Sequence, residues 1–148
     1  MNPHSEASIT EELTPFAHGA QNRCFGCGVA NSLGLHLEFG MAPDGSVVSH
    51  AQISDQYEGP PGYLHGGIIA TLLDEAMSKA NRARGVVAMT RQMQVEYLRP
   101  VPSGKPIRIE ASVTRSEGRK HWSAAQILNS EGAILAQATG LFIAVRPR

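Results

Sequence analysis

A glycine turn that leads into a helical pattern is the stretch of this sequence best suited to chemistry. His65-Gly66-Gly67 stands directly before apolar residues that recur at helical spacing, at positions 68, 69, 72, 73, 76, 77 and 80. The first N–H groups of a helix have no intrahelical acceptor and lie at the positive end of its dipole. We therefore expect the Gly66 N–H, with Gly67 beside it, to bind an oxyanion.

A carboxylate follows on the polar stripe of the same predicted helix. Asp74 lies eight residues after Gly66, which is roughly 12 Å along a helix at about 1.5 Å per residue. One small electrophile does not easily touch both, so a shared carbonyl requires two helices and hence two copies of the chain. Ser78, one turn later, is placed to orient the carboxylate or a water. The alternative is an ordinary turn followed by a solvated aspartate.

Length and composition bound the class of protein. The chain has 148 residues, 42% of them hydrophobic, which suits one globular domain. Thirteen basic residues balance thirteen acidic ones, which argues against nucleic acid or an anionic membrane as the main partner. No apolar run approaches the roughly 20 residues of a membrane helix, and the N-terminus has no secretory signal pattern. We expect a cytoplasmic protein.

The two cysteines form a C-x-x-C at Cys24 and Cys27. Two thiols cannot complete a four-ligand zinc site, and the usual second cysteine pair is missing. A redox C-x-x-C normally opens a helix, whereas this one precedes a predicted strand. The preferred interpretation is a tight structural turn, with zinc and redox chemistry as less favoured alternatives. We expect no metal and no cofactor.

The remaining pattern predicts an α+β domain. Residues 1–21 are polar and form a flexible N-terminal segment, in which Thr10 could cap a short helix over residues 9–13. A single domain then covers residues 22–148. Its one long helix runs from Gly66 to Arg82 and ends at Gly85. Strands are expected at residues 35–39, 47–53, 86–97, 107–114, 120–128 and 134–145.

Three motifs together resemble a known family. His65-Gly66-Gly67, then Asp74, then Tyr97-Leu98-Arg99-Pro100-Val101 are similar to the hotdog-fold acyl-CoA thioesterases of the phenylacetate-pathway (PaaI) type, within the 4-hydroxybenzoyl-CoA thioesterase superfamily. The resemblance covers about residues 22 to 146. It implies one central helix wrapped by a curved antiparallel sheet of about six strands, an acyl-CoA substrate, and a homodimer or a dimer of dimers.

The resemblance also implies catalytic roles. The Gly66 N–H would bind the thioester carbonyl, and Asp74 of the other subunit would activate water or attack directly. His65 would either bind the carbonyl or brace the turn. Thr90 matches a serine that orients water in some relatives, whereas others use a hydroxyl at the position of Ser78. Both hydroxyls remain candidates.

One position departs from the family pattern. Many relatives carry an asparagine six residues before the histidine, where this chain has Gly59. Tyr57, Glu58 or Arg91 would then have to bind the substrate in its place. Arg99, at the end of a predicted strand, is a candidate for the CoA phosphates.

Two other functions stay open at this point, because a fold does not determine a reaction. A hotdog domain can bind acyl-CoA without hydrolysing it. A hydratase or dehydratase on the same fold would pair a carboxylate with a histidine in a different local pattern.

Overall fold

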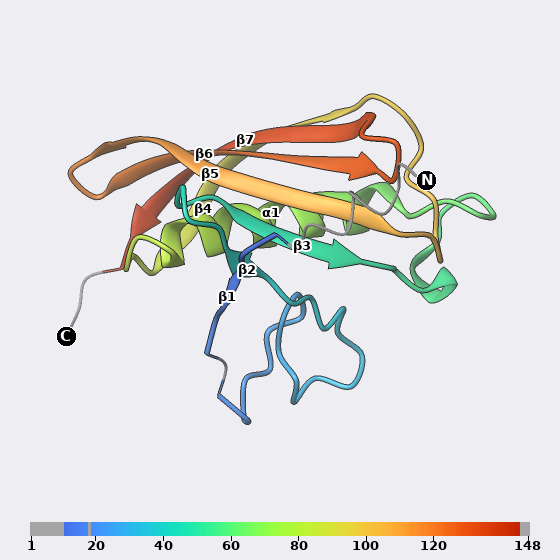
Figure 1. The fold of residues 1–148 in the computed structure, drawn as a ribbon, viewed down its shortest axis with the longest axis horizontal. Helices are drawn as coiled ribbons and strands as arrows, with labels where there is room; N and C mark the ends of the chain where they lie inside the picture. The colour runs from blue at the N-terminus through green and yellow to red at the C-terminus, as the bar shows by residue number, and fades with distance from the viewer. Residues whose placement is uncertain (1–10, 18, 146–148) are drawn as a thin grey trace, which may run out of the picture.

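One long helix lies against an antiparallel sheet. The computed structural model describes residues 11–17 and 19–145. The sheet has seven strands in the order β1-β2-β3-β5-β6-β7-β4, and every pairing is antiparallel. In chain order the elements are β1 (Thr14–Pro15), β2 (Gly40–Met41), β3 (Val47–Ala51), the 3-10 turn η2 (Asp55–Tyr57), α1 (Gly66–Arg82), β4 (Ala88–Tyr97), β5 (Ile107–Glu117), β6 (Lys120–Asn129) and β7 (Ile134–Ala144). Figure 1 shows α1 along one face of the curved sheet.

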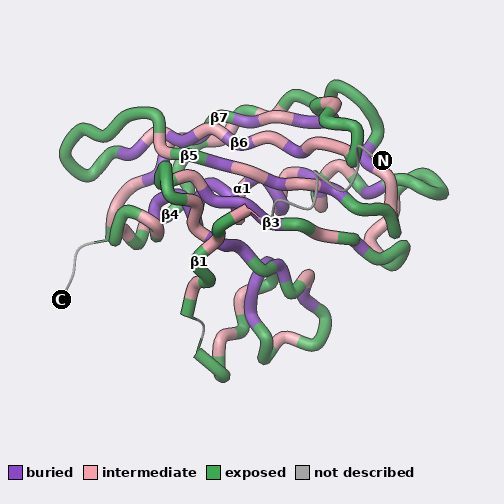
Figure 2. Tube along the Cα trace, viewed as in Figure 1, coloured by how far each residue is buried: buried purple, intermediate pink, exposed green. Residues whose placement is uncertain are grey.

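The apolar stripe of α1 forms the centre of the core. Leu72, Leu73 and Met77 are fully buried and belong to one cluster with Ile109 and Phe142 of the sheet. Buried residues alternate with more exposed ones along the central strands, as a sheet with one covered face requires (Figure 2). The helix therefore owes its position to apolar packing, and its polar stripe is left free for other contacts.

The helix has the predicted bounds, Gly66 to Arg82. Gly85 follows with φ of 78°, a conformation in which a side chain would be strained. The four strands after the helix are also confirmed, with small changes at their ends.

The strand predicted at residues 35–39 is wrong. Leu37 and Phe39 are buried and His36 is exposed, so the alternation is real. However, His36 has φ of 51°, which interrupts the extended backbone. The N–H groups of Leu35 and Leu37 donate to carbonyls of residues 25 and 26, at 2.7 and 2.8 Å, instead of to a neighbouring strand. In this part of the chain, sheet pairing begins at Gly40.

The N-terminal segment adds a strand. Thr14 and Pro15 pair with Met41 and Gly40, which makes β1 the seventh strand. Residues 11–13 are not helical, and the proposed cap Thr10 lies outside the described residues. The domain boundary near residue 21 stays a prediction.

Candidate active site

The first turn of α1 presents a free donor. His65 is the N-cap, and its Nδ1 accepts a hydrogen bond from the Gly67 N–H at 2.9 Å. The backbone of Ile69 donates to the His65 carbonyl at 3.0 Å. Among the described residues, the Gly66 N–H has no acceptor. One donor at the positive end of the helix is thus available, and the His65 side chain has the geometry of a brace.

Tyr97 holds the same turn from the sheet. Its hydroxyl donates to the Gly66 carbonyl at 2.9 Å, and its ring lies beside Gly66. Sequence reasoning had placed Tyr97 in the family motif without assigning it a role. The only signal in the sequence was a tyrosine at the end of a strand, which does not reveal a contact with a helix 31 residues earlier.

Asp74 is half-buried and has one partner on the sheet. The Thr90 hydroxyl donates to Asp74 Oδ1 at 2.6 Å. Burial raises the pKa of Asp74 from its ordinary value and the Glu75 charge adds to this, while the Thr90 hydrogen bond opposes it. Ser78 is half-buried and makes no hydrogen bond to Asp74 within the described part of the chain. Of the two candidate hydroxyls, the structure brings Thr90 to the carboxylate.

A β-bulge lets one strand reach both ends of this site. In the pairing of β4 with β7, Thr90 opposes Phe142 and Gln92 opposes Leu141, so Arg91 is an extra residue. Thr90 and Tyr97 are seven positions apart and would face opposite sides of a regular strand. The extra residue reverses the alternation, and both side chains face α1.

The loop before the helix uses its polar side chains internally. The Tyr57 hydroxyl donates to the carbonyls of Leu33 and Gly34, at 2.7 and 3.1 Å. Glu58 Oε2 accepts from the Gly62 N–H at 3.0 Å and from the Ser103 hydroxyl at 2.5 Å. These bonds anchor the loop that delivers the chain to His65.

Gly59 has little room for a side chain. A Cβ at this position would lie 3.2 Å from the His65 Cα, closer than an ordinary contact. An asparagine at this position would therefore require a small shift of the His65 backbone. Arg91 and Arg99 are exposed and have no ion pair within the described residues, so both can meet a solvent-borne anion.

The C-x-x-C does not open a helix. Cys27 is buried, and burial together with the Glu75 carboxylate raises its pKa to about 12. A thiol with such a pKa is a weak nucleophile, which disfavours redox chemistry.

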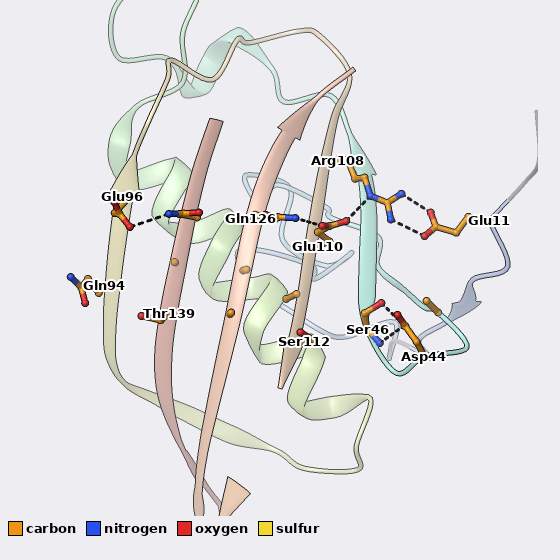
Figure 3. Close-up of a pocket in the computed structure, with 16 residues that line it drawn as sticks. Glu11, Asp44, Ser46, Gln94, Glu96, Arg108, Glu110, Ser112, Gln126 and Thr139 are labelled. Atoms are coloured by element: carbon orange, nitrogen blue, oxygen red, sulfur yellow. Dashed lines mark hydrogen bonds and ion pairs between the residues drawn. The ribbon is translucent and has the colours of Figure 1, made fainter. Parts of the chain in front are cut away.

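A hollow on the sheet lies away from these residues. A depression of about 670 Å³ follows the sheet face opposite α1 (Figure 3). Arg108 in this depression pairs with Glu11 at 2.6 and 2.8 Å and with Glu110, which also accepts from Gln126. None of the candidate residues lines it, so it is separate from the chemistry around α1.

Comparison with known proteins decides the family. Residues 61–136, more than half of the chain, match the family model of the thioesterase superfamily, and this range holds the glycine turn and Asp74. The chain belongs to the thioesterase superfamily. It is similar to the acyl-coenzyme A thioesterase THEM4 of Xenopus laevis, with 37% identity over 61% of this chain and 41% of the relative. The rat THEM4 is 30% identical over 77% of this chain and 51% of the relative. The chain thus spans about half the length of these curated relatives or less.

Solved structures of superfamily members share the architecture. The thioesterase superfamily protein RHA08564 superposes with a TM-score of 0.78 at 30% identity, over 95% of this chain and 71% of that one. The E. coli PaaI protein superposes with a TM-score of 0.69 at 20% identity, over 76% of this chain and 81% of that one. The predicted α+β hotdog fold is confirmed, and the sheet has seven strands, of which β1 and β2 lie outside the six expected ranges. None of the described helices is long and apolar enough to cross a bilayer.

Proposed function

We propose that this protein hydrolyses an acyl-CoA thioester to a free acid and CoA. The observation that carries the proposal is that one helix holds both a free backbone donor, the Gly66 N–H, and a carboxylate, Asp74, that accepts a hydrogen bond from Thr90. Membership of the thioesterase superfamily supports it. The THEM4 relatives are named acyl-CoA thioesterases, and smu.793 of Streptococcus mutans, which shares the fold, was crystallised with acetyl CoA.

The helix geometry supports an active site shared between two subunits. Gly66 and Asp74 lie eight residues apart in one uninterrupted helix, roughly 12 Å along its axis. The Gly66 N–H points out of the helix start, away from Asp74. An oxyanion donor lies about 2.7–3.1 Å from its oxygen and an attacking atom about 3–3.5 Å from the carbonyl carbon. We infer that Gly66 of one subunit works with Asp74 of the partner subunit.

The exposed edge of the sheet supports the corresponding dimer. β4 is the last strand of the sheet and has ten residues, most of them exposed. One side of its backbone has no neighbouring strand within the described residues. An open edge of this length is a hazard unless it is paired. Antiparallel pairing of two β4 strands about a twofold axis would protect the edge, in a homodimer that acts alone or as half of a tetramer.

The chemistry follows from the free atoms. Thr90 occupies Asp74 Oδ1, which leaves Oδ2 to accept a proton from water as the water oxygen attacks the carbonyl carbon. Negative charge moves to the carbonyl oxygen, where the Gly66 N–H and the helix dipole stabilise it. The C–S bond then breaks, and CoA leaves as a thiolate that needs no strong acid. In the alternative, Asp74 attacks directly and water hydrolyses the resulting anhydride. Arg91 and Arg99 would attract the CoA phosphates.

Release of free thiol from a panel of acyl-CoAs tests the proposal. We expect hydrolysis by the wild type and a fall in kcat of about 10²–10⁴-fold for Asp74→Asn, the usual contribution of a general base. Thiol release that is unchanged in the variant would remove Asp74 from the mechanism. Binding of acyl-CoA without any release would favour a non-catalytic acyl-CoA-binding module.

A further inference from the structure

The cysteine turn brings four ionisable side chains together on the flank of α1. The backbone N–H of Gly28 donates to the Cys24 carbonyl at 2.8 Å, which closes the turn. Cys24 Sγ lies 3.6 Å from Glu75 Oε2, and Cys27 Sγ lies 3.3 Å from Lys79 Nζ. The two sulfurs and a Glu75 oxygen all lie within 4.8 Å of one another. This group is the thiol–carboxylate cluster, and no step of the proposed hydrolysis uses it.

The packing of the turn is specific to this cluster. A Cβ on Gly26 would lie 2.6 Å from Glu75 Oε2, and a Cβ on Gly28 would lie 2.4 Å from the Cys24 nitrogen. At Gly28 the neighbours are backbone atoms and only glycine fits, whereas a side chain at Gly26 would displace the Glu75 carboxylate. Cys27 is 4% exposed and Lys79 is 9% exposed, whereas Cys24 and Glu75 are half-buried, so the cluster lies just below the surface, where water can reach it.

We propose that Cys24, Cys27 and Glu75 bind a thiophilic divalent cation, with zinc as the best match, and that water completes the coordination. Zinc binds thiolate at about 2.3 Å and carboxylate at about 2.0–2.2 Å in a tetrahedron, which places neighbouring ligands roughly 3.5–3.8 Å apart. The Cys24–Glu75 separation of 3.6 Å already has this value. The third ligand atom is within reach of both, so small side-chain movements complete the site.

The charges of the cluster balance with the metal and without it. In the metal-free chain, Glu75 and Lys79 form an ion pair at 3.6 Å beside the two cysteines. Zinc adds two positive charges, and the two thiols each lose a proton to solvent, so the net charge stays zero. Burial of an uncompensated charge, the usual obstacle to an internal ion, is therefore avoided.

Lys79 and Asn22 contact the proposed ligands from outside the cluster, as side chains around a metal site commonly do. Glu75 Oε1 lies 3.6 Å from Lys79 Nζ, while Oε2 faces Cys24. One carboxylate oxygen can thus ligate while the other keeps its ion pair. Asn22 Nδ2 donates to Cys27 Sγ at 3.7 Å, a contact that would support a thiolate. Such second contacts fix ligand orientation and commonly change metal affinity by about 10–100-fold.

Cobalt(II) binding to the reduced, chelator-treated full chain tests the site. We expect one Co²⁺ per chain, a thiolate-to-cobalt charge-transfer band in the near ultraviolet, and displacement by Zn²⁺. Cys24→Ser and Cys27→Ser should each lower the intensity of the band, because one thiolate remains, and should weaken zinc binding by more than about 100-fold, since a lost ligand costs more than a lost outer contact. Glu75→Gln should weaken zinc binding by at least about tenfold. Asp74→Asn is the matched control: it changes the neighbouring carboxylate, lies outside the cluster, and should bind metal like the wild type.

Several outcomes would overturn the site. Cobalt that binds without a charge-transfer band, or zinc affinity that survives in the double serine variant, would place the metal on other residues. Equal losses in Asp74→Asn and Glu75→Gln would show a general effect of helix charge. Circular dichroism of each variant at the assay temperature identifies unfolding, and the spectrum of the wild type decides the question if the serine variants do not fold. The readout is metal binding, so a negative result leaves the proposed hydrolysis untouched.

Discussion

Replacing Thr90 with valine removes one hydroxyl and keeps the shape of the side chain. The only change expected at the site is loss of the 2.6 Å hydrogen bond to Asp74 Oδ1. Without this bond the carboxylate can rotate, so fewer molecules hold the base in line with its water. Thr90 contacts Asp74 and is not placed against the substrate, so we expect KM to change little while kcat falls. Thr90 is a positioning residue in this scheme.

The size of the effect follows from the type of bond. A hydrogen bond to a charged group contributes about 1.5–3 kcal/mol, and about 1.4 kcal/mol corresponds to a tenfold change in rate. Loss of the whole bond would therefore cost about 10–150-fold. Thr90 is exposed at the surface of the chain, so water can replace part of the bond. We expect a fall in kcat near the lower limit, about tenfold.

The assay combines steady-state thiol release with its pH profile. The Thr90 hydrogen bond lowers the pKa of Asp74, so its loss should move the acid limb of the profile to higher pH. Thr90→Ser keeps a hydroxyl and should restore both the rate and the limb. Ser78→Ala is the matched control and should stay within about twofold of wild type, because Ser78 does not bond to Asp74 within the described residues. The scheme would be refuted if Ser78→Ala lost most of its kcat while Thr90→Val kept the wild-type kcat and pH profile.

Two further predictions concern stability. Burial raises the pKa of Asp74 above its ordinary 3.8, so the folded chain binds the carboxyl proton more tightly than the unfolded chain does. Stability therefore falls as the pH rises from 3.8 through the higher pKa of the folded chain. Asp74→Asn should therefore raise Tm at neutral pH and leave it unchanged well below pH 3.8; an equal gain at both pH values would contradict the burial argument. His65→Ala removes the N-cap and should cost about 0.5–2 kcal/mol in urea unfolding, which His65→Asn should recover. Recovery of stability without recovery of thiol release would show that His65 binds the carbonyl instead of bracing the turn.

The sequence was informative wherever a pattern is local. The bounds of α1 followed from its apolar stripe, from His65 before it and from Gly85 after it. The later strands followed from alternation and glycine turns. Alternation also predicted burial at residues 35–39, but it could not predict which backbone groups would pair. Those N–H groups bond to the cysteine turn, a partner that no local pattern specifies.

Contacts between distant elements marked the limit of prediction. Asp74 and Thr90 were both candidates from the sequence, yet their 2.6 Å contact depends on how β4 lies beside α1. The contact of Tyr97 with Gly66 was missed because it requires the bulge at Arg91. The sequence did not single out Glu75, because the cysteines that approach it stand about fifty residues earlier in the chain.

The bulge at Arg91 also limits how this chain can change in evolution. Seven positions separate Thr90 from Tyr97, and both side chains must face α1. Deletion of one residue between them would remove the bulge and make the interval six, which equals the six positions from Phe142 to Ala136 opposite them on β7, so the two side chains would keep both their face and their span. Insertion of one residue beside the existing bulge would turn one of the two side chains to the opposite face. Descendants of this sequence can therefore lose the extra residue of the bulge more easily than they can gain another residue between Thr90 and Tyr97.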